Sequence, residues 1–167
     1  APPMSLRALV LIATLAVAAA TAGFDLSYFQ GDVSQDAFNC LAGAGYEFAI
    51  FQCQRSTGDI NPYVVDDINR ARAAGIKYTD VYLFPTINMG GADQAKATTQ
   101  FLLDNNVLDS NMIWIDIESA KLFYADCNKN VQLLRDIIAQ IDSMYKGCGL
   151  DSCVGIYSSA SQWGIMC

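Results

Sequence analysis

The sequence predicts an α/β protein built around a parallel β-sheet. Five short apolar segments recur along the chain, and longer amphipathic segments separate them. Because parallel neighbours need a long crossover, usually a helix, this alternation favours a parallel sheet. The 167 residues contain no linker, low-complexity tract or internal repeat, which indicates a single domain. An open doubly wound sheet and a (β/α) barrel both satisfy the pattern.

The elements can be placed one by one along the chain. The predicted strands are residues 23–27, 48–54, 76–84, 112–118 and 154–158. The predicted helices are residues 34–44, 62–74, 93–105 and 130–145. Gly45 breaks the first helix, Pro62 suits the start of the second and Gly75 its end, and Pro85 closes the third strand. The last helix has the clearest three-to-four spacing of apolar side chains, through Val131, Leu134, Ile138, Ile141 and Tyr145.

The first 22 residues have the features of a secretory signal peptide. Arg7 provides a positive start, residues 9–20 form an apolar run, and Ala20-Thr21-Ala22 is a small-residue cleavage site. The run is short for a membrane span, so an uncleaved anchor is the weaker alternative. We therefore expect a domain over residues 23–167 that is secreted or lies in the lumen of a phagosomal, lysosomal or digestive compartment. No stable membrane insertion is expected after cleavage.

Charge and residue types exclude several functions. The net charge is −7 and no basic cluster exists, which argues against nucleic-acid binding. The chain contains no histidine, so Ser-His-Asp and Cys-His catalysis and the usual zinc hydrolase sites are excluded. Acid–base chemistry must come from Asp, Glu, Tyr, Lys or Cys, and we expect no cofactor and no metal.

The six cysteines predict disulfides, because their number is even and a signal peptide precedes them. They are Cys40, Cys53, Cys127, Cys148, Cys153 and Cys167. Cys148 and Cys153 flank a short loop and form the best local pair. Six cysteines allow 15 pairings, so the remaining connectivity stays open. A metal site is disfavoured, because there is no CxxC pair and no histidine.

The fourth predicted strand ends in two acids. Residues alternate between faces along a strand, so Asp116 and Glu118 share one face and the isoleucines of IWIDIE share the other. Both acids stand at the C-terminal end, where parallel-barrel active sites form. Their proximity should raise one pKa and keep a proton beside a carboxylate, as glycoside cleavage requires. The alternative is that they cap a loop or bind a cation.

Other strands place further candidates around this pair. Asp25 stands on the first strand and faces away from its apolar neighbours. Aromatic residues predicted to bind substrate come from the third strand, the fifth strand and just beyond it: Tyr82, Phe84, Tyr157 and Trp163. An acid cluster ringed by aromatic side chains suits a sugar, although for any single Tyr or Phe core packing is the more common role.

These segments, in this order, resemble the family 25 glycoside hydrolases, the Chalaropsis-type lysozymes. The resemblance rests on GFDLSYFQG, YLFPT, IWIDIE and VGIYSSASQW, and RSTG at residues 55–58 is similar to the animal and protist branch. It implies a modified (β/α) TIM-like barrel of five β/α units followed by three strands. It also implies hydrolysis of the β-1,4 bond between N-acetylmuramic acid and N-acetylglucosamine in bacterial peptidoglycan.

The resemblance also implies roles for single residues. Glu118 resembles the general acid, and Asp116 resembles its partner, which orients or stabilises the acetamido group of the substrate or assists the second step. Asp25 resembles the acid of the first strand in the same cluster. Tyr82 and Tyr157 resemble residues that contact the sugar or order the cluster.

The family pattern continues through three further strands, whereas this chain stops at Cys167. We therefore expect an incomplete barrel over residues 23–167, and an oligomer only if its open edge is real. A secreted lysozyme for defence or digestion of bacteria is the first hypothesis, and a non-catalytic glycan-binding variant is the alternative. A chitinase of the DxxDxDxE type is disfavoured, because Met112 and Trp114 stand where its earlier acids would be.

Overall fold

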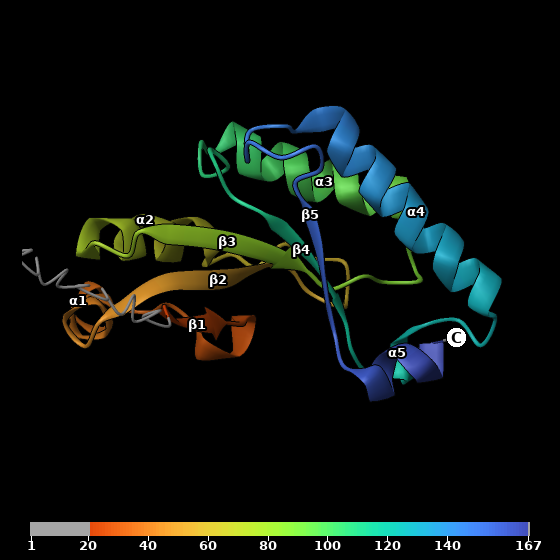
Figure 1. The fold of residues 1–167 in the computed structure, drawn as a ribbon, viewed down its shortest axis with the longest axis horizontal. Coiled ribbons are helices and arrows are strands. Elements are labelled where there is room, and N and C mark those ends of the chain that lie inside the picture. The colour runs from red at the N-terminus through yellow and green to blue at the C-terminus, as the bar shows by residue number, and fades with distance from the viewer. Residues whose placement is uncertain (1–20, 167) are drawn as a thin grey trace, which may run out of the picture.

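All five strands run parallel and follow one another across the sheet in chain order (Figure 1). This computed structural model describes residues 21–166, so most of the predicted signal peptide lies outside it. The strands are β1 (Ala22–Leu26), β2 (Tyr46–Gln54), β3 (Tyr78–Leu83), β4 (Ile113–Ile117) and β5 (Val154–Ser158). All five predicted strands are confirmed to within two residues at each end. The order β1-β2-β3-β4-β5 is that of a barrel wall, because a doubly wound sheet reverses its order at a switch point.

Helices fill the connections between the strands, as predicted. They are α1 (Gln35–Gly43), α2 (Val64–Ala74), α3 (Gly91–Asp104) and α4 (Cys127–Met144). Three elements were not predicted: the 3-10 turns η1 (Tyr28–Gln30) and η2 (Ala120–Leu122) and the helix α5 (Ala160–Met166). Helix α4 begins earlier than predicted because the Asp126 side chain caps it by accepting from Asn128 N. None of the described helices is both long and apolar enough to cross a membrane.

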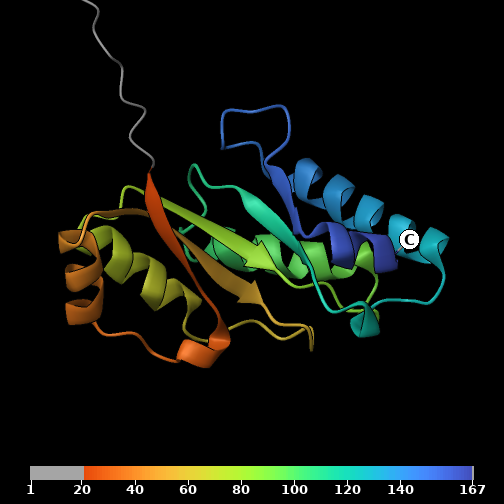
Figure 2. The ribbon, with the colours of Figure 1, turned by 60° about the horizontal axis from the view of Figure 1, so that its bottom comes forward.

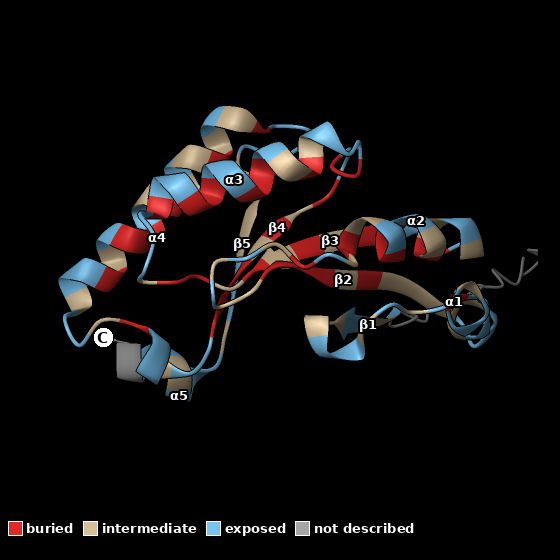
Figure 3. Ribbon diagram, turned by 180° about the vertical axis from the view of Figure 1, so that it is seen from behind, coloured by how far each residue is buried: buried red, intermediate tan, exposed pale blue. Residues whose placement is uncertain are grey.

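One face of the sheet is covered by helices and holds the core. Thr79, Val81 and Leu83 of β3 are buried there, whereas Asp80 and Tyr82 face the other side and are half-buried. The three isoleucines of β4 are fully or nearly fully buried, which confirms that they pack against helices. Figure 1 shows α3 and α4 side by side over this face, and Figure 3 shows buried residues concentrated between helices and strands.

Helix α4 turns a slightly different face inward than predicted. Leu134, Ile141 and Tyr145 are buried as expected, but Leu133 and Ile137 complete the buried face. The predicted Val131 and Ile138 are only half-buried. Both the predicted and the observed sets of buried residues follow helical spacing. The spacing alone therefore did not determine which residues lie at the centre of the buried face.

A buried network of side-chain amides joins the end of β2 to α3. Gln54 Nε2 donates to Gln94 Oε1 at 3.1 Å, and Thr98 Oγ1 donates to Gln54 Oε1 at 2.9 Å. Gln94 also accepts from Thr86 N and donates to Thr86 O, each at 3.0 Å. Because these buried groups have partners, the network fixes the loop that follows β3.

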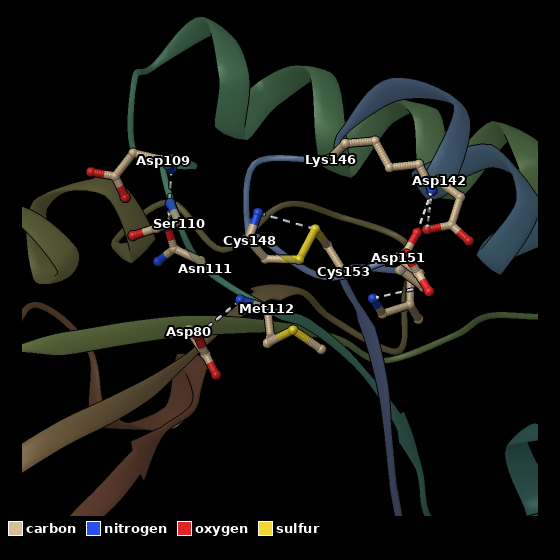
Figure 4. The surroundings of a disulfide bond; sticks show 12 residues. Asp80, Asp109, Ser110, Asn111, Met112, Asp142, Lys146, Cys148, Asp151 and Cys153 are labelled. Atoms are coloured by element: carbon tan, nitrogen blue, oxygen red, sulfur yellow. Dashed lines mark hydrogen bonds and ion pairs between the residues drawn. A yellow bond between two sulfur atoms is a disulfide. The ribbon is translucent and has the colours of Figure 1, made fainter.

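The predicted pair Cys148–Cys153 is confirmed as a disulfide between α4 and β5 (Figure 4). Cys127 is also disulfide-bonded. The prediction that all six cysteines pair is wrong for Cys40 and Cys53, which are free thiols. Cys40 is exposed and Cys53 is fully buried in the core, where its side chain serves as a small apolar group. Cys167 lies outside the described residues.

The two edge strands of the described sheet are β1 and β5, and each pairs with one neighbouring strand. Within residues 21–166, β1 pairs only with β2 and β5 pairs only with β4 (Figure 2). Ile156 of β5 is 42% exposed, although its neighbour in register, Ile115, is fully buried. The sheet is therefore well covered at its centre and open at β5.

We predict that Gly91→Ala destabilises the fold. Gly91 begins α3 where it meets α4, and a Cβ there would lie 2.5 Å from the backbone oxygen of Leu133. The two helices would have to separate, so the free energy of unfolding should fall by about 1–3 kcal/mol in urea titrations. Gly43→Ala is the matched control, because space around this helical glycine is open and its effect should be neutral or stabilising. Equal effects of the two substitutions would contradict the prediction.

Candidate active site

A cavity of about 310 Å³ opens on the face of the sheet opposite the helices. Its wall receives residues from all five strands and the turn after β4: Asp25, Ile50, Tyr82, Trp114, Asp116, Glu118 and Tyr157. Three of these are acids and two are tyrosines, so the polar part of the wall is rich in carboxyl and hydroxyl groups. The apolar part comes from Ile50 and Trp114.

Strand register explains why residues so distant in sequence meet here. Asp25 of β1 is in register with Ile50 of β2, and Asp116 of β4 with Tyr157 of β5. Tyr82 of β3 is in register with Trp114 of β4. Neighbouring strands lie about 4.8 Å apart, and side chains two residues apart share a face. The alternation along each strand therefore turns all these side chains to the same side.

Asp116 is the most perturbed acid of the cavity. It is 9% exposed, and its Oδ1 atom has no hydrogen-bond partner among the described residues. Burial, followed by the charges of Glu118 and Asp25, raises the pKa of Asp116 to about 7. The sequence predicted that one acid of the Asp116–Glu118 pair would have a raised pKa. The structure places that shift on Asp116, which is therefore largely protonated below neutral pH.

Tyr82 lies within the influence of all three acids. Burial raises the pKa of Tyr82 well above its ordinary value, and the charges of Asp116, Asp25 and Glu118 raise it further. The phenol therefore keeps its proton throughout the physiological range. It is a permanent hydroxyl donor among groups that mainly accept.

The structure brings together five of the seven predicted site residues. Asp25, Asp116, Glu118, Tyr82 and Tyr157 line the cavity. Phe84 does not, because β3 ends at Leu83 and Phe84 packs against the core instead. Trp163 lies on α5, is 44% exposed and is not part of the cavity wall.

Ile50 and Trp114 are cavity residues that sequence reasoning did not select. Trp114 lies two residues before Asp116 in the strand, so the sequence already placed it on the same face as the acids. Ile50 carries no such signal, because its position depends on the register between β1 and β2. Across residues 21–166, no three Asp, Glu or Cys side chains are grouped so that they could hold a metal ion.

The fold and the cavity define a protein of the (β/α)-barrel class with a carboxyl cluster at the C-terminal side of its parallel strands. The family profile described as lysozyme-like protein 1 matches residues 18–166. Probable GH family 25 lysozyme 4 of Dictyostelium discoideum is 36% identical over 156 residues, covering 93% of this chain and 68% of that protein. The chain therefore belongs to the glycoside hydrolase family 25 lysozymes, and it spans about two thirds of the length of this relative.

Solved structures confirm the fold. The muramidase from Trichobolus zukalii is 18% identical and matches with a TM-score of 0.65 over 86% of this chain and 68% of its own. The modular autolysin LytC from Streptococcus pneumoniae, solved in complex with a synthetic peptidoglycan ligand, matches with a TM-score of 0.67. That match covers 86% of this chain and 33% of LytC at 18% identity.

We predict that Asp116→Asn increases stability at high pH. The pKa of Asp116 is higher in the folded protein than in the unfolded chain, so the folded state binds the extra proton between about pH 4 and pH 7. Stability therefore falls as pH rises through this window. Asparagine removes the titration, and the variant should gain about 2–4 kcal/mol over the parent between pH 4 and pH 8.

Thermal or urea unfolding at several pH values tests this. Asp151→Asn, a change in the exposed loop that the Cys148–Cys153 disulfide closes, is the matched control and should follow the parent. Parallel pH profiles for the parent and Asp116→Asn would show that Asp116 is not the titrating group.

Proposed function

We propose that the protein is an N-acetylmuramidase that hydrolyses the β-1,4 bond between N-acetylmuramic acid and N-acetylglucosamine in bacterial peptidoglycan. The observation that carries the proposal is the gathering of Asp25, Asp116 and Glu118 in one cavity of a family 25 chain. A peptidoglycan ligand bound to LytC, which shares the fold, supports the substrate class. No cofactor is needed for this reaction, because carboxyl groups can supply both acid and electrostatic catalysis.

Glu118 is proposed as the general acid. It follows β4 directly and lines the cavity at its C-terminal side, where a glycosidic oxygen can approach. Donation of its proton to the leaving oxygen lets the C1–O bond break without expelling an alkoxide. The positive charge that develops at C1 is stabilised by the nearby carboxyl groups, of which Asp25 comes from the opposite edge of the wall. A water molecule then bonds to C1 and gives up a proton to a carboxylate of the cluster, which completes the hydrolysis.

Asp116 is proposed as the partner of the acetamido group next to C1. Asp116 lines the cavity, and its buried Oδ1 atom has no hydrogen-bond donor among the described residues. In its neutral form it donates a hydrogen bond to the acetamide oxygen, and in its ionised form it accepts from the acetamide N–H. Tyr82 and Tyr157 are proposed to contact the sugar hydroxyls. Phe84 and Trp163 lie outside the cavity wall and are not part of this proposal.

Secretion and a role in defence against bacteria or their digestion are also part of the proposal. The apolar run over residues 9–20 and the small-residue site that ends at Ala22 support export. A net charge of −7 suits an acidic phagosomal, lysosomal or digestive lumen, where partial protonation of carboxylates reduces repulsion. Detection of the mature N-terminus at Gly23 in culture medium would support export.

We predict that Glu118→Gln removes the activity. Glutamine preserves size and cannot donate a proton to the leaving oxygen, so the rate should fall at least about 100-fold. Purified protein is incubated with bacterial peptidoglycan, and new reducing ends are identified by mass spectrometry. Glu47→Gln is the matched control, because Glu47 is the only other glutamate and pairs with Lys77 away from the cavity.

Reducing N-acetylmuramic acid released by the parent and the Glu47 variant only would support the proposal. Equal release by the Glu118 variant would remove Glu118 from the chemistry. Binding of peptidoglycan by all three proteins with no release would instead identify the chain as a non-catalytic glycan binder.

A further inference from the structure

Trp114 is the one large apolar side chain of the cavity wall that two neighbouring strands hold in place. On the side of β3, its Nε1–H donates to Asp80 Oδ2 at 2.9 Å. Asp80 Oδ1 accepts from Met112 N at 2.9 Å, and Figure 4 shows Asp80 beside Met112. The same carboxylate therefore binds both the backbone of Met112 and the indole of Trp114. A tryptophan N–H away from water requires such an acceptor.

On the side of β5, the absence of a side chain at Gly155 makes room for the ring. A Cβ at position 155 would lie 2.4 Å from Trp114 Cε3 and 2.5 Å from Cζ3. Gly155 is in register with Trp114, so the six-membered part of the indole lies over the backbone of β5. The ring thus extends from Asp80 on one neighbouring strand to Gly155 on the other, and its orientation is fixed from both sides.

This arrangement makes an apolar surface beside the acids. Trp114 and Asp116 share one face of β4 and stand about 6–7 Å apart along it. Ile50 is the other apolar residue of the wall, and all the remaining wall residues bear carboxyl or hydroxyl groups. A ligand with a polar rim and one small apolar group would therefore place that group against Trp114.

We propose that Trp114 is the contact for the methyl group of a 2-acetamido sugar, and that Asp80 is the positioning residue that holds the indole for this contact. The inference rests on the proposed function, because the N-acetyl group belongs to that substrate. When Asp116 binds the acetamide oxygen or N–H, the methyl of the same planar group must lie close by. The nearest apolar side chain on the same strand face is Trp114.

The test compares two soluble peptidoglycan tetrasaccharides that differ by this methyl group alone, one N-acetylated and one N-formylated. Trp163→Phe leaves Trp114 as the only tryptophan, because the chain contains two. In that background we expect the N-acetyl ligand to change Trp114 fluorescence and to bind about 10- to 200-fold more tightly than the N-formyl ligand, as for one methyl group in an apolar pocket. Trp114→Phe should reduce this ratio to less than about threefold.

Asp80 is tested with Asp80→Ala, which removes both acceptors, and Asp80→Asn, which keeps one. The preference for N-acetyl should be lost in the alanine variant and partly restored in the asparagine variant, together with a graded shift of Trp114 emission. Thr79→Val is the matched control on the same strand. Its hydroxyl accepts hydrogen bonds from Arg72 Nε and Asn111 Nδ2 on the other face, so its loss should lower stability and leave the preference unchanged.

The outcomes separate this inference from the proposed function. Tight, methyl-dependent binding without any cleavage supports the role of Trp114 and refutes only catalysis. Cleavage of peptidoglycan with equal affinity for both ligands, or with no response of Trp114 fluorescence, overturns the role of Trp114 and leaves catalysis intact. Absence of binding of both tetrasaccharides to the parent also overturns it, whatever the activity on whole peptidoglycan.

Discussion

Parallel pairing in chain order is the constraint on which the rest of this structure depends. Each parallel step requires a helix or long crossover to return the chain to the starting edge, which accounts for α1 to α4. It also directs the C-terminal ends of all strands to one side. Asp25 on the first strand and Tyr157 on β5 can therefore line one cavity although 132 residues separate them in sequence.

The two faces of the sheet have opposite requirements, and single residues show the difference. On the helix side, Ile113, Ile115 and Ile117 fill the core, and removal of their apolar surface from water stabilises the fold. On the cavity side, Asp116 is also largely withdrawn from water, but it carries an ionisable group with an unpartnered oxygen. The Asp116 side chain lowers the stability of the folded protein whenever it is charged, because a buried carboxylate loses hydration. Such residues are characteristic of sites that bind or transform a ligand.

Much of the fold was predictable, because it depends on local periodicity. The alternation in IWIDIE correctly separated the buried isoleucines from the acids, and the pair Cys148–Cys153 followed from its short loop. What failed depends on distant contacts. Cys53 is not paired because β2 turns its side chain into the core, and Phe84 is not in the cavity because β3 ends one residue earlier.

The candidate site shows the same division. The sequence could place Asp116, Glu118 and Trp114 on one face, since all three belong to one strand and its end. It could not show that Gly155 leaves room for an indole or that Asp80 would hold it, because both facts depend on pairing among β3, β4 and β5. Ile50 gave no signal at all, because one aliphatic residue in a strand resembles every other.

The apolar wall and the acids of the cavity depend on each other. Burial is the largest cause of the raised pKa of Asp116, so the side chains that keep water from it help to set its protonation state. Trp114 lies two residues before Asp116 on the same face of β4, and Tyr82 of β3 is in register with Trp114. Both rings are half-buried in the cavity wall, whereas Tyr157 of the same wall is 58% exposed. A change in an apolar ring, with no charge of its own, would therefore alter the acid–base chemistry as well as the fit of a sugar. In this cavity, packing and proton affinity are properties of the same few side chains.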